Sequence, residues 1–167
     1  MKVLALGISD EECVAGCRPA TDPDLLAGHF EVRRRVFVEE QRIFAVTDCD
    51  EVDLRPEAIH LVALFDGTVV GAVRLYPLDL PGTRWKGDRL AVLPQFRATS
   101  FGSDLVRLAV RTSSLEGGSV MAAMIQPANV RYFERLGWLR DGEPVEYVGH
   151  EHQPMSIALW FNAIVGP

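Results

Sequence analysis

Two β-rich runs with a tight turn between them are the strongest constraint on how this chain folds. Residues 59–65 and 68–76 are rich in valine, leucine and aromatic residues, and Asp66-Gly67 separates them. An Asp-Gly pair favours the positive φ angles of a two-residue hairpin turn. The sequence therefore predicts an antiparallel β-hairpin over 59–76, around which the rest of the fold is built.

The part of the chain before the hairpin predicts one strand and one helix. A strand is expected over 12–20. Apolar residues then recur at helical spacing over 23–40, with Asp22 as the N-cap and Pro23 at the first helical position. The acidic residues that follow have no sustained period, so a loop with one short helical turn is expected there.

The second half of the chain continues this alternation. In chain order we expect a loop over 77–87, a strand over 89–93, a helix over 101–116, a strand buried on both faces over 119–125, a helix over 127–137 and short strands over 138–161. Gly117-Gly118 ends the longer helix. The order predicts one mixed α/β domain over 1–167, with its core over about 13–160.

Size and charge exclude several classes of protein. The chain has 167 residues and a formal net charge of −6, which is unsuited to binding a nucleic-acid backbone. No apolar run approaches the ~20 residues of a membrane span. Three irregularly spaced cysteines indicate a reducing compartment, and they offer no paired zinc ligands. We therefore expect a cytoplasmic protein without a metal, a nucleic-acid partner or a membrane partner.

The acidic residues are concentrated between Glu39 and Glu57. This stretch holds seven carboxylates and two arginines, so it carries nearly all of the net charge. Two interpretations remain open at this point. The stretch is either an ordinary solvated loop or a surface that attracts a cationic substrate.

A strand, a turn and a helix start follow one another from Arg89 to Ser103. The turn contains Arg97 and a series of small residues. Exposed N–H groups at the start of a helix, with the helix dipole behind them, bind phosphates. The segment is a candidate pyrophosphate site, although an ordinary turn fits the same residues.

Two segments resemble the GNAT family of N-acetyltransferases. Residues 97–102 resemble its coenzyme A loop, Arg/Gln-x-x-Gly-x-Gly/Ala, with Ser100 in place of the first glycine. Residues 129–138 resemble the helix that flanks the thiol of the coenzyme. The resemblance implies the acyl-CoA N-acyltransferase fold, a mostly antiparallel sheet with splayed central strands flanked by helices. It also implies acetyl-CoA as co-substrate and pairing as a homodimer.

The same resemblance places the coenzyme on this chain. The pantetheine arm and thioester are expected at Leu90, Ala91 and Val92, with a backbone N–H near Ala91 or Val92 polarising the thioester. The thiol end is expected at Asn129 and Phe133. The pyrophosphate is expected on Arg97, Ala98, Thr99, Ser100, Phe101, Gly102 and Ser103.

Other segments narrow the resemblance in two directions. Residues 35–41, 48–53, 70–75 and 149–155 are similar to a bacterial subgroup of nitrogen-starvation N-acetyltransferases. The front half also resembles acyl-homoserine lactone synthases. Two alternatives follow: an acyltransferase that uses a longer acyl donor, or a non-catalytic sensor that binds acyl-CoA.

The two residues that usually exchange protons in GNAT enzymes are replaced. Arg89 stands at the position of the glutamate base and Phe133 at that of the tyrosine acid. Asp88 is set aside, because neighbours on a strand point to opposite faces. We expect an acetyl group to pass directly to a primary amine of a small, cationic acceptor. The candidate bases are Glu40, Asp50, Glu51, Asp53 and His152, and the nearest hydroxyl for the acid is that of Tyr132.

Overall fold

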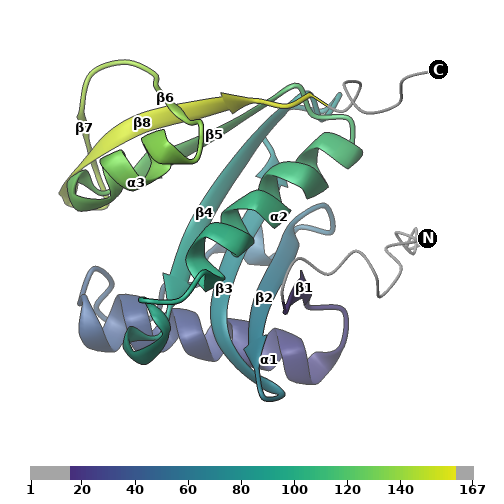
Figure 1. The fold of residues 1–167 in the computed structure, drawn as a ribbon, viewed down its shortest axis with the longest axis vertical. Helices are drawn as coiled ribbons and strands as arrows, with labels where there is room; N and C mark the ends of the chain where they lie inside the picture. Colours follow the sequence, from purple (N-terminus) through teal and green to yellow (C-terminus); the bar gives the residue numbers. More distant parts are fainter. Residues whose placement is uncertain (1–15, 161–167) are drawn as a thin grey trace.

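The computed structural model describes residues 16–160, which form one mixed α/β domain (Figure 1). The strands are β1 (Cys17–Pro19), β2 (Ile59–Phe65), β3 (Thr68–Pro77), β4 (Arg84–Val92), β5 (Val120–Ile125), β6 (Leu139–Arg140), β7 (Val145–Tyr147) and β8 (His150–Ala158). The α-helices are α1 (Pro23–Arg33), α2 (Phe101–Leu115) and α3 (Val130–Arg135). A π-helical segment, η2 (Arg34–Glu40), continues α1, and short 3-10 turns are η3 (Glu51–Leu54), η4 (Pro94–Phe96) and η5 (Pro127–Asn129).

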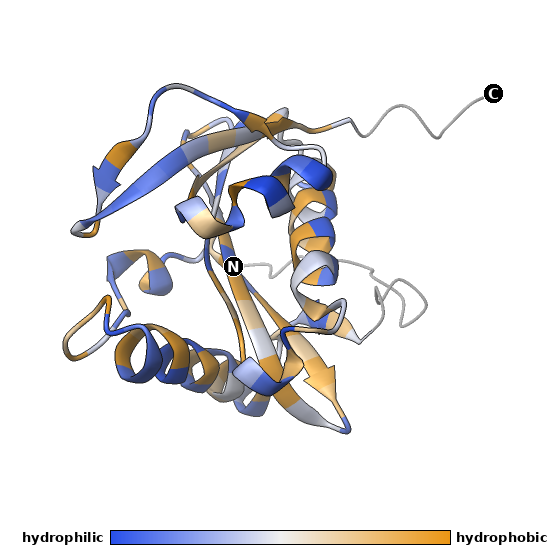
Figure 2. Cartoon of the chain, turned by 60° about the vertical axis from the view of Figure 1, so that its left-hand side comes forward, coloured by the Kyte–Doolittle hydropathy of each residue, from blue (hydrophilic) through white to orange (hydrophobic). Residues whose placement is uncertain are grey.

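One sheet carries the fold, in the strand order β1-β2-β3-β4-β5-β8-β6, with β7 paired to β8. The predicted hairpin is confirmed, because β2 and β3 pair antiparallel and meet at the predicted turn. Among the described strands, β4 and β5 alone run parallel. Helices α1 and α2 lie on opposite sides of β2–β4 (Figures 1 and 2). Figure 2 shows the apolar residues of these strands and of α2 gathered between the layers. This is the mixed α/β sheet that the sequence predicts.

The parallel pair β4–β5 holds together at one end only. Arg84–Lys86 pair with Val120–Ala122, and beyond these three residues the strands diverge. Figure 1 shows the two halves of the sheet opening like a V from this point. Backbone groups and side chains of both strands are therefore left facing an opening in the middle of the sheet.

The first helix begins as the sequence predicts, but its C-terminal part is not α-helical. Its start is as predicted, because the backbone N–H of Leu25 donates to Asp22 Oδ1 at 2.9 Å and Pro23 begins the helix. Its last seven residues form a π-helix, in which the N–H of Gln41 donates to the carbonyl of Val36 at 2.8 Å. Such wide turns occur often at functional sites. Here the wide turn ends at Glu40, which contacts Arg97, and the next residue, Gln41, lines the opening.

The loop expected over 77–87 is wrong in its second half. Strand β4 already begins at Arg84, where Trp85 pairs with Pro77 of β3 and with Met121 of β5. The local sequence carries no alternating pattern there, and pairing on both sides supplies the strand instead. The first strand is described only from Cys17, so residues 12–15 of that prediction lie outside the described residues.

The third helix and the strand before it also differ in detail from the prediction. Residues 127–129 form a 3-10 turn, and the α-helix itself ends at Arg135. Burial alternates along β5 instead of covering both faces, with Met121, Ala123 and Ile125 buried and the residues between them partly exposed. No helix in the described range 16–160 is long and apolar enough to cross a membrane.

A β-bulge interrupts β4 where the strands diverge. Ala72 pairs with Ala91 and Arg74 with Asp88, so Arg89 and Leu90 together face the single residue between that pair on β3. Arg89 has a φ of 53°, which is unusual for a residue other than glycine. The expectation that Asp88 and Arg89 point to opposite faces is wrong, because the bulge breaks the alternation. The Arg89 Nη1 atom lies 3.9 Å from Asp88 Oδ2.

Candidate active site

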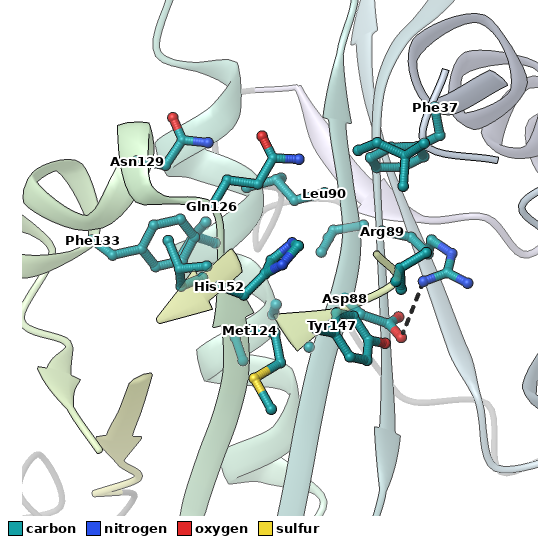
Figure 3. Close-up of a pocket in the computed structure, with 18 of the residues that line it drawn as sticks. Phe37, Asp88, Arg89, Leu90, Met124, Gln126, Asn129, Phe133, Tyr147 and His152 are labelled. Carbon is teal, nitrogen blue, oxygen red and sulfur yellow. Dashed lines mark ion pairs between the residues drawn. The ribbon is translucent and has the colours of Figure 1, made fainter. Parts of the chain in front are cut away.

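A cleft of about 150 Å³ lies where β4 and β5 diverge, and Figure 3 shows most of the residues that line it. Its wall is mostly apolar, with a few polar groups among the apolar ones. The polar and titratable lining residues are Gln41, Asp88, Arg89, Gln126, Asn129, Tyr147 and His152. A pocket that is mainly apolar and carries convergent polar groups is typical of a site for a small molecule.

His152 occupies the middle of this cleft. The residue is 6% exposed, and its ring lies between the end of β5 and the bulge of β4 (Figure 3). Nδ1 lies 2.9 Å from the backbone carbonyl of His150, so Nδ1 carries the hydrogen and donates it. In the neutral form of the ring, this hydrogen bond leaves the lone pair on Nε2, as a proton acceptor requires.

Tyr147 stands beside His152, on β7. The two rings are perpendicular, with their centroids 5.3 Å apart. The ammonium of Lys86 donates to the Tyr147 hydroxyl at 3.3 Å and lies 4.8 Å from the centre of its ring. Among the described residues that line the cleft, Tyr147 is the one tyrosine. The sequence-based candidates did not include it.

Behind the cleft, Arg74 is fully buried and bound by three aspartates. Its guanidinium donates to Asp88 at 2.7 and 2.8 Å, to Asp50 at 2.6 Å, and pairs with Asp53 at 3.0 Å. Hydrogen bonds and charges of these carboxylates outweigh burial, which alone lowers the pKa of Arg74, and keep that pKa above its ordinary value. Arg74 thus fixes the Asp88 carboxylate at the cleft wall.

Arg33 forms the second centre of this cluster, on α1. It is also fully buried, with Nε 2.7 Å from Asp48 and Nη1 2.7 Å from Asp53. Burial raises the pKa of Asp53, but hydrogen bonds from Arg33 and the backbone of Asp50, with the charges of Arg33 and Arg74, hold it well below its ordinary range. We call Arg33, Arg74, Arg89, Asp48, Asp50, Asp53 and Asp88 the arginine–aspartate network.

The acidic stretch is therefore neutralised by arginines from elsewhere in the chain. Asp48, Asp50 and Asp53 all accept from arginines of α1, β3 or β4. Asp50 and Asp53 also form a reciprocal capping box that fixes the turn η3. Glu51 is exposed. These contacts give the stretch an internal structural role that counting its charges does not reveal.

One buried and one partly buried histidine, His29 and His60, extend the network from the other side. His29 Nδ1 lies 3.0 Å from the Leu61 carbonyl, so Nε2 accepts from Arg33 at 3.3 Å and from His60 at 3.1 Å. Burial and the neighbouring His60 lower the pKa of His29 to about 3. Burial lowers the pKa of His60 as well. Both rings are neutral in the folded protein at neutral pH.

These histidines predict a stability that falls in acid. The unfolded chain takes up protons below its ordinary histidine pKa of about 6.5, whereas folded His29 does not until far lower pH. The free energy of unfolding should therefore fall by up to about 1.4 kcal/mol per pH unit for His29 between about pH 6 and about pH 4. Urea unfolding at several pH values measures this change in the free energy of unfolding. The His29→Gln variant should show a shallower slope, and an equal slope would contradict the prediction.

The predicted coenzyme loop forms the start of α2. Ser100 is the N-cap but gives no side-chain cap, since its hydroxyl donates to Asp104 at 2.7 Å. The first turn of a helix leaves N–H groups without helical partners, and they are free for an anion. A Cβ on Gly102 would lie 3.3 Å from the Tyr132 hydroxyl, so the helix start and α3 approach closely there.

Arg97 and Glu40 form an ion pair outside the cleft, next to Gln41, which lines it. Arg97 Nη1 lies 2.7 Å from Glu40 Oε1, and Arg97 Nε donates to the Val92 carbonyl at 2.9 Å. Gln126 donates to Gln41 at 3.2 Å nearby. The end of η2 and the residue after it therefore contact Arg97 of the predicted coenzyme loop and Gln126 at the end of β5.

The structure brings together some of the sequence-predicted residues and separates others. Of the candidate acids and bases, His152 lines the cleft, while Glu40, Asp50, Asp53 and Tyr132 do not. Of the expected coenzyme residues, the cleft is lined by Leu90, Asn129 and Phe133, and the others lie outside it: Ala91, Val92, Arg97, Ala98, Thr99, Ser100, Phe101, Gly102 and Ser103.

Several residues in and behind the cleft were not among the sequence-based candidates. Asp88 was excluded by strand alternation, and Tyr147 had no motif around it. Arg74 did carry a signal: a lone charged residue inside an apolar strand is rarely buried without a partner. Within residues 16–160, no group of three or more histidine, cysteine, aspartate or glutamate side chains is arranged to hold a metal ion.

Comparison with known proteins fits this geometry. A family model described as the acetyltransferase (GNAT) family matches residues 25–138. A Bacillus subtilis (strain 168) protein assigned as an acetyltransferase is 28% identical over 128 residues, which cover 76% of this chain and 85% of that protein. The chain belongs to the acetyltransferase (GNAT) family, and it is an acyltransferase.

Solved structures share the fold. Escherichia coli ElaA aligns with a TM-score of 0.74 and 19% identity, covering 84% of this chain and 97% of that one. The CoA-dependent acyl-homoserine lactone synthase BjaI, solved with SAM and isopentyl-CoA, aligns with a TM-score of 0.71 and 19% identity, covering 87% and 82%. The predicted GNAT fold is confirmed, and the nitrogen-starvation subgroup stays a prediction.

Proposed function

We propose that this acyltransferase moves an acetyl group from acetyl-CoA to the primary amine of a small acceptor, directly and in one ternary complex. The observation that carries the proposal is the cleft between the diverging strands, with the Nε2 atom of His152 inside it. Leu90, Asn129 and Phe133 would hold the thiol end of the donor there. The start of α2 would bind the pyrophosphate outside the cleft.

The chemistry needs a neutral amine. An alkylamine arrives as an ammonium ion with a pKa near ~10.4, so a base must remove one proton. His152 Nε2 takes that proton, and the amine nitrogen attacks the thioester carbonyl carbon. A C–N bond forms, the C–S bond breaks, and the sulfur leaves as a thiolate. Tyr147, beside the Lys86 ammonium, donates a proton to that sulfur. The new amide nitrogen releases its second proton, which returns to the Tyr147 oxygen through solvent, and His152 gives up its proton to solvent.

The donor site can be tested by calorimetric titration with acetyl-CoA, coenzyme A and a long-chain acyl-CoA. We expect micromolar binding of acetyl-CoA, and at least a 100-fold weaker affinity in Gly102→Glu, because the new carboxylate would repel the pyrophosphate and crowd Tyr132 (about 3 kcal/mol). Thr68→Glu, on the exposed hairpin end, is the matched control.

Three outcomes separate the alternatives. Tight binding of only the long-chain donor would favour the acyl-homoserine-lactone-like reaction. Binding of acetyl-CoA without thiol release for any amine would favour the sensor. No binding at all would overturn the coenzyme role of residues 97–103. The homodimer stays a prediction that light scattering of the purified protein would check.

A further inference from the structure

Arg89 places a cation in the cleft. By the family resemblance, its position is the one where a glutamate usually acts as the base. The side chain lines the cleft from the bulge of β4. Its φ of 53° is a costly conformation for an arginine, and the surrounding structure must hold it in place. Strained residues of this kind cluster at binding and catalytic sites, so the direction in which this guanidinium points is informative.

The guanidinium is held on three sides and open on the fourth. Nε donates to the Asp48 carbonyl at 3.1 Å, and Nη2 donates to Asp50 at 3.2 Å. The Cζ atom lies 4.7 Å from the centre of the Phe44 ring. Nη1 makes no hydrogen bond within residues 16–160, because its neighbour Asp88 Oδ2 is 3.9 Å away. Two N–H bonds of a fixed cation therefore remain for a ligand.

Asp88 supplies the opposite charge next to Nη1. Its two oxygens accept from Arg74, which fixes the carboxylate without using all of its lone pairs. Figure 3 shows the Asp88 carboxylate between Tyr147 and the guanidinium of Arg89. The cleft thus presents an anionic and a cationic group side by side. An α-amino acid carries its ammonium and carboxylate on one carbon, which matches such a pair.

The rest of the wall is neutral or apolar. The arginine–aspartate network sets three arginines against four aspartates, so it produces no strong field of either sign. Phe37, Ile43, Phe44 and Val148 line the acceptor side of the cleft. This environment suits an apolar substituent better than a second charge.

We propose that the acceptor is an α-amino acid with an apolar side chain. Its carboxylate binds Arg89 Nη1, and its amino group lies between Asp88 and His152, facing the thioester. This inference rests on the proposed acyltransferase function. It replaces the simple cationic acceptor expected from the acidic stretch with a zwitterionic one.

Matched pairs of acceptors test the inference. Thiol release from acetyl-CoA is measured with L-phenylalanine against phenethylamine, and with L-leucine against isopentylamine. Because an amine without the carboxylate leaves the N–H bonds of Arg89 Nη1 without a hydrogen-bond partner, kcat/KM should fall about 10- to 100-fold for each amine. In Arg89→Gln that preference should shrink to less than about threefold, and Arg84→Gln, an exposed residue of the same strand, should keep it. If Arg89→Gln fails to fold, Arg89→Lys is tested in its place. It retains the charge but loses the fixed guanidinium geometry, so the preference for the amino acid should also shrink.

The outcomes distinguish this inference from the proposed function. If the amines are acetylated as well as the amino acids, or if Arg89→Gln keeps the preference, the inference is overturned and the acyltransferase function stands. If no acceptor releases thiol, calorimetry with L-phenylalanine and the coenzyme A-saturated protein decides. Binding that Arg89→Gln loses supports the inference, and no binding overturns it. If acetyl-CoA itself does not bind, both proposals fail.

Discussion

Replacing His152 with asparagine should lower kcat by about 100- to 10,000-fold, because positioned general bases contribute rate factors of that size. The asparagine amide still donates to the His150 carbonyl, as Nδ1 does now, so the fold around the site should persist. It offers no basic nitrogen in place of Nε2. Stopped-time thiol-release assays with an active acceptor give kcat and KM separately.

The pattern of constants makes the test specific. KM for acetyl-CoA should change less than about threefold, because His152 would act on the amine and not on the donor. His150→Gln is the matched control, since His150 is exposed on the same strand and contributes only its backbone carbonyl. If His152→Asn keeps the wild-type kcat, His152 is not the base. One of the candidate carboxylates would then have to take the proton.

Replacing Arg74 with methionine should destabilise the domain by about 3–5 kcal/mol, as expected when one partner of a buried ion pair is removed. The arginine is fully buried, and its loss would leave Asp50, Asp53 and Asp88 facing one another without their shared cation. Asp88 would also lose its fixed position at the cleft. Urea unfolding followed by circular dichroism measures the change in the free energy of unfolding.

A second arginine provides the comparison. Arg55 pairs with Glu57 at 2.9 Å, but its side chain is 36% exposed. Exposed pairs contribute about 0–1 kcal/mol, so Arg55→Met should change stability by less than about 1 kcal/mol. Similar losses in both variants would show that the network does not depend on the buried charge of Arg74. In that case apolar packing would be the main stabilising interaction in this region.

Local sequence signals predict most of the fold. The hairpin turn at Asp66-Gly67, the cap at Asp22 and the glycine after the longer helix are local features, because each depends on the backbone preferences of one or two residues. The structure confirms all three. The resemblance of residues 97–102 and 129–138 to family motifs likewise identified the family that the comparisons show.

The site depended on contacts that no local pattern encodes. Strand β4 starts early because two neighbouring strands pair with it, and its bulge turns Arg89 to the same side as Asp88. The sequence predicts free negative charge in the acidic stretch, yet arginines 15 or more residues away pair with its aspartates. Charge pairing and strand divergence depend on which residues lie close together in the folded protein, and a local sequence pattern does not specify this.

The sequence by itself therefore identified the family and the order of the main elements, since the motifs, turns and caps that indicate them each lie in a short run of residues. The tertiary structure alone decided which candidate groups share a cleft. It placed His152 with Asp88, Arg89 and Tyr147, residues that come from three different strands. Their meeting follows from the divergence of β4 and β5, which is a property of the folded sheet and of no single segment.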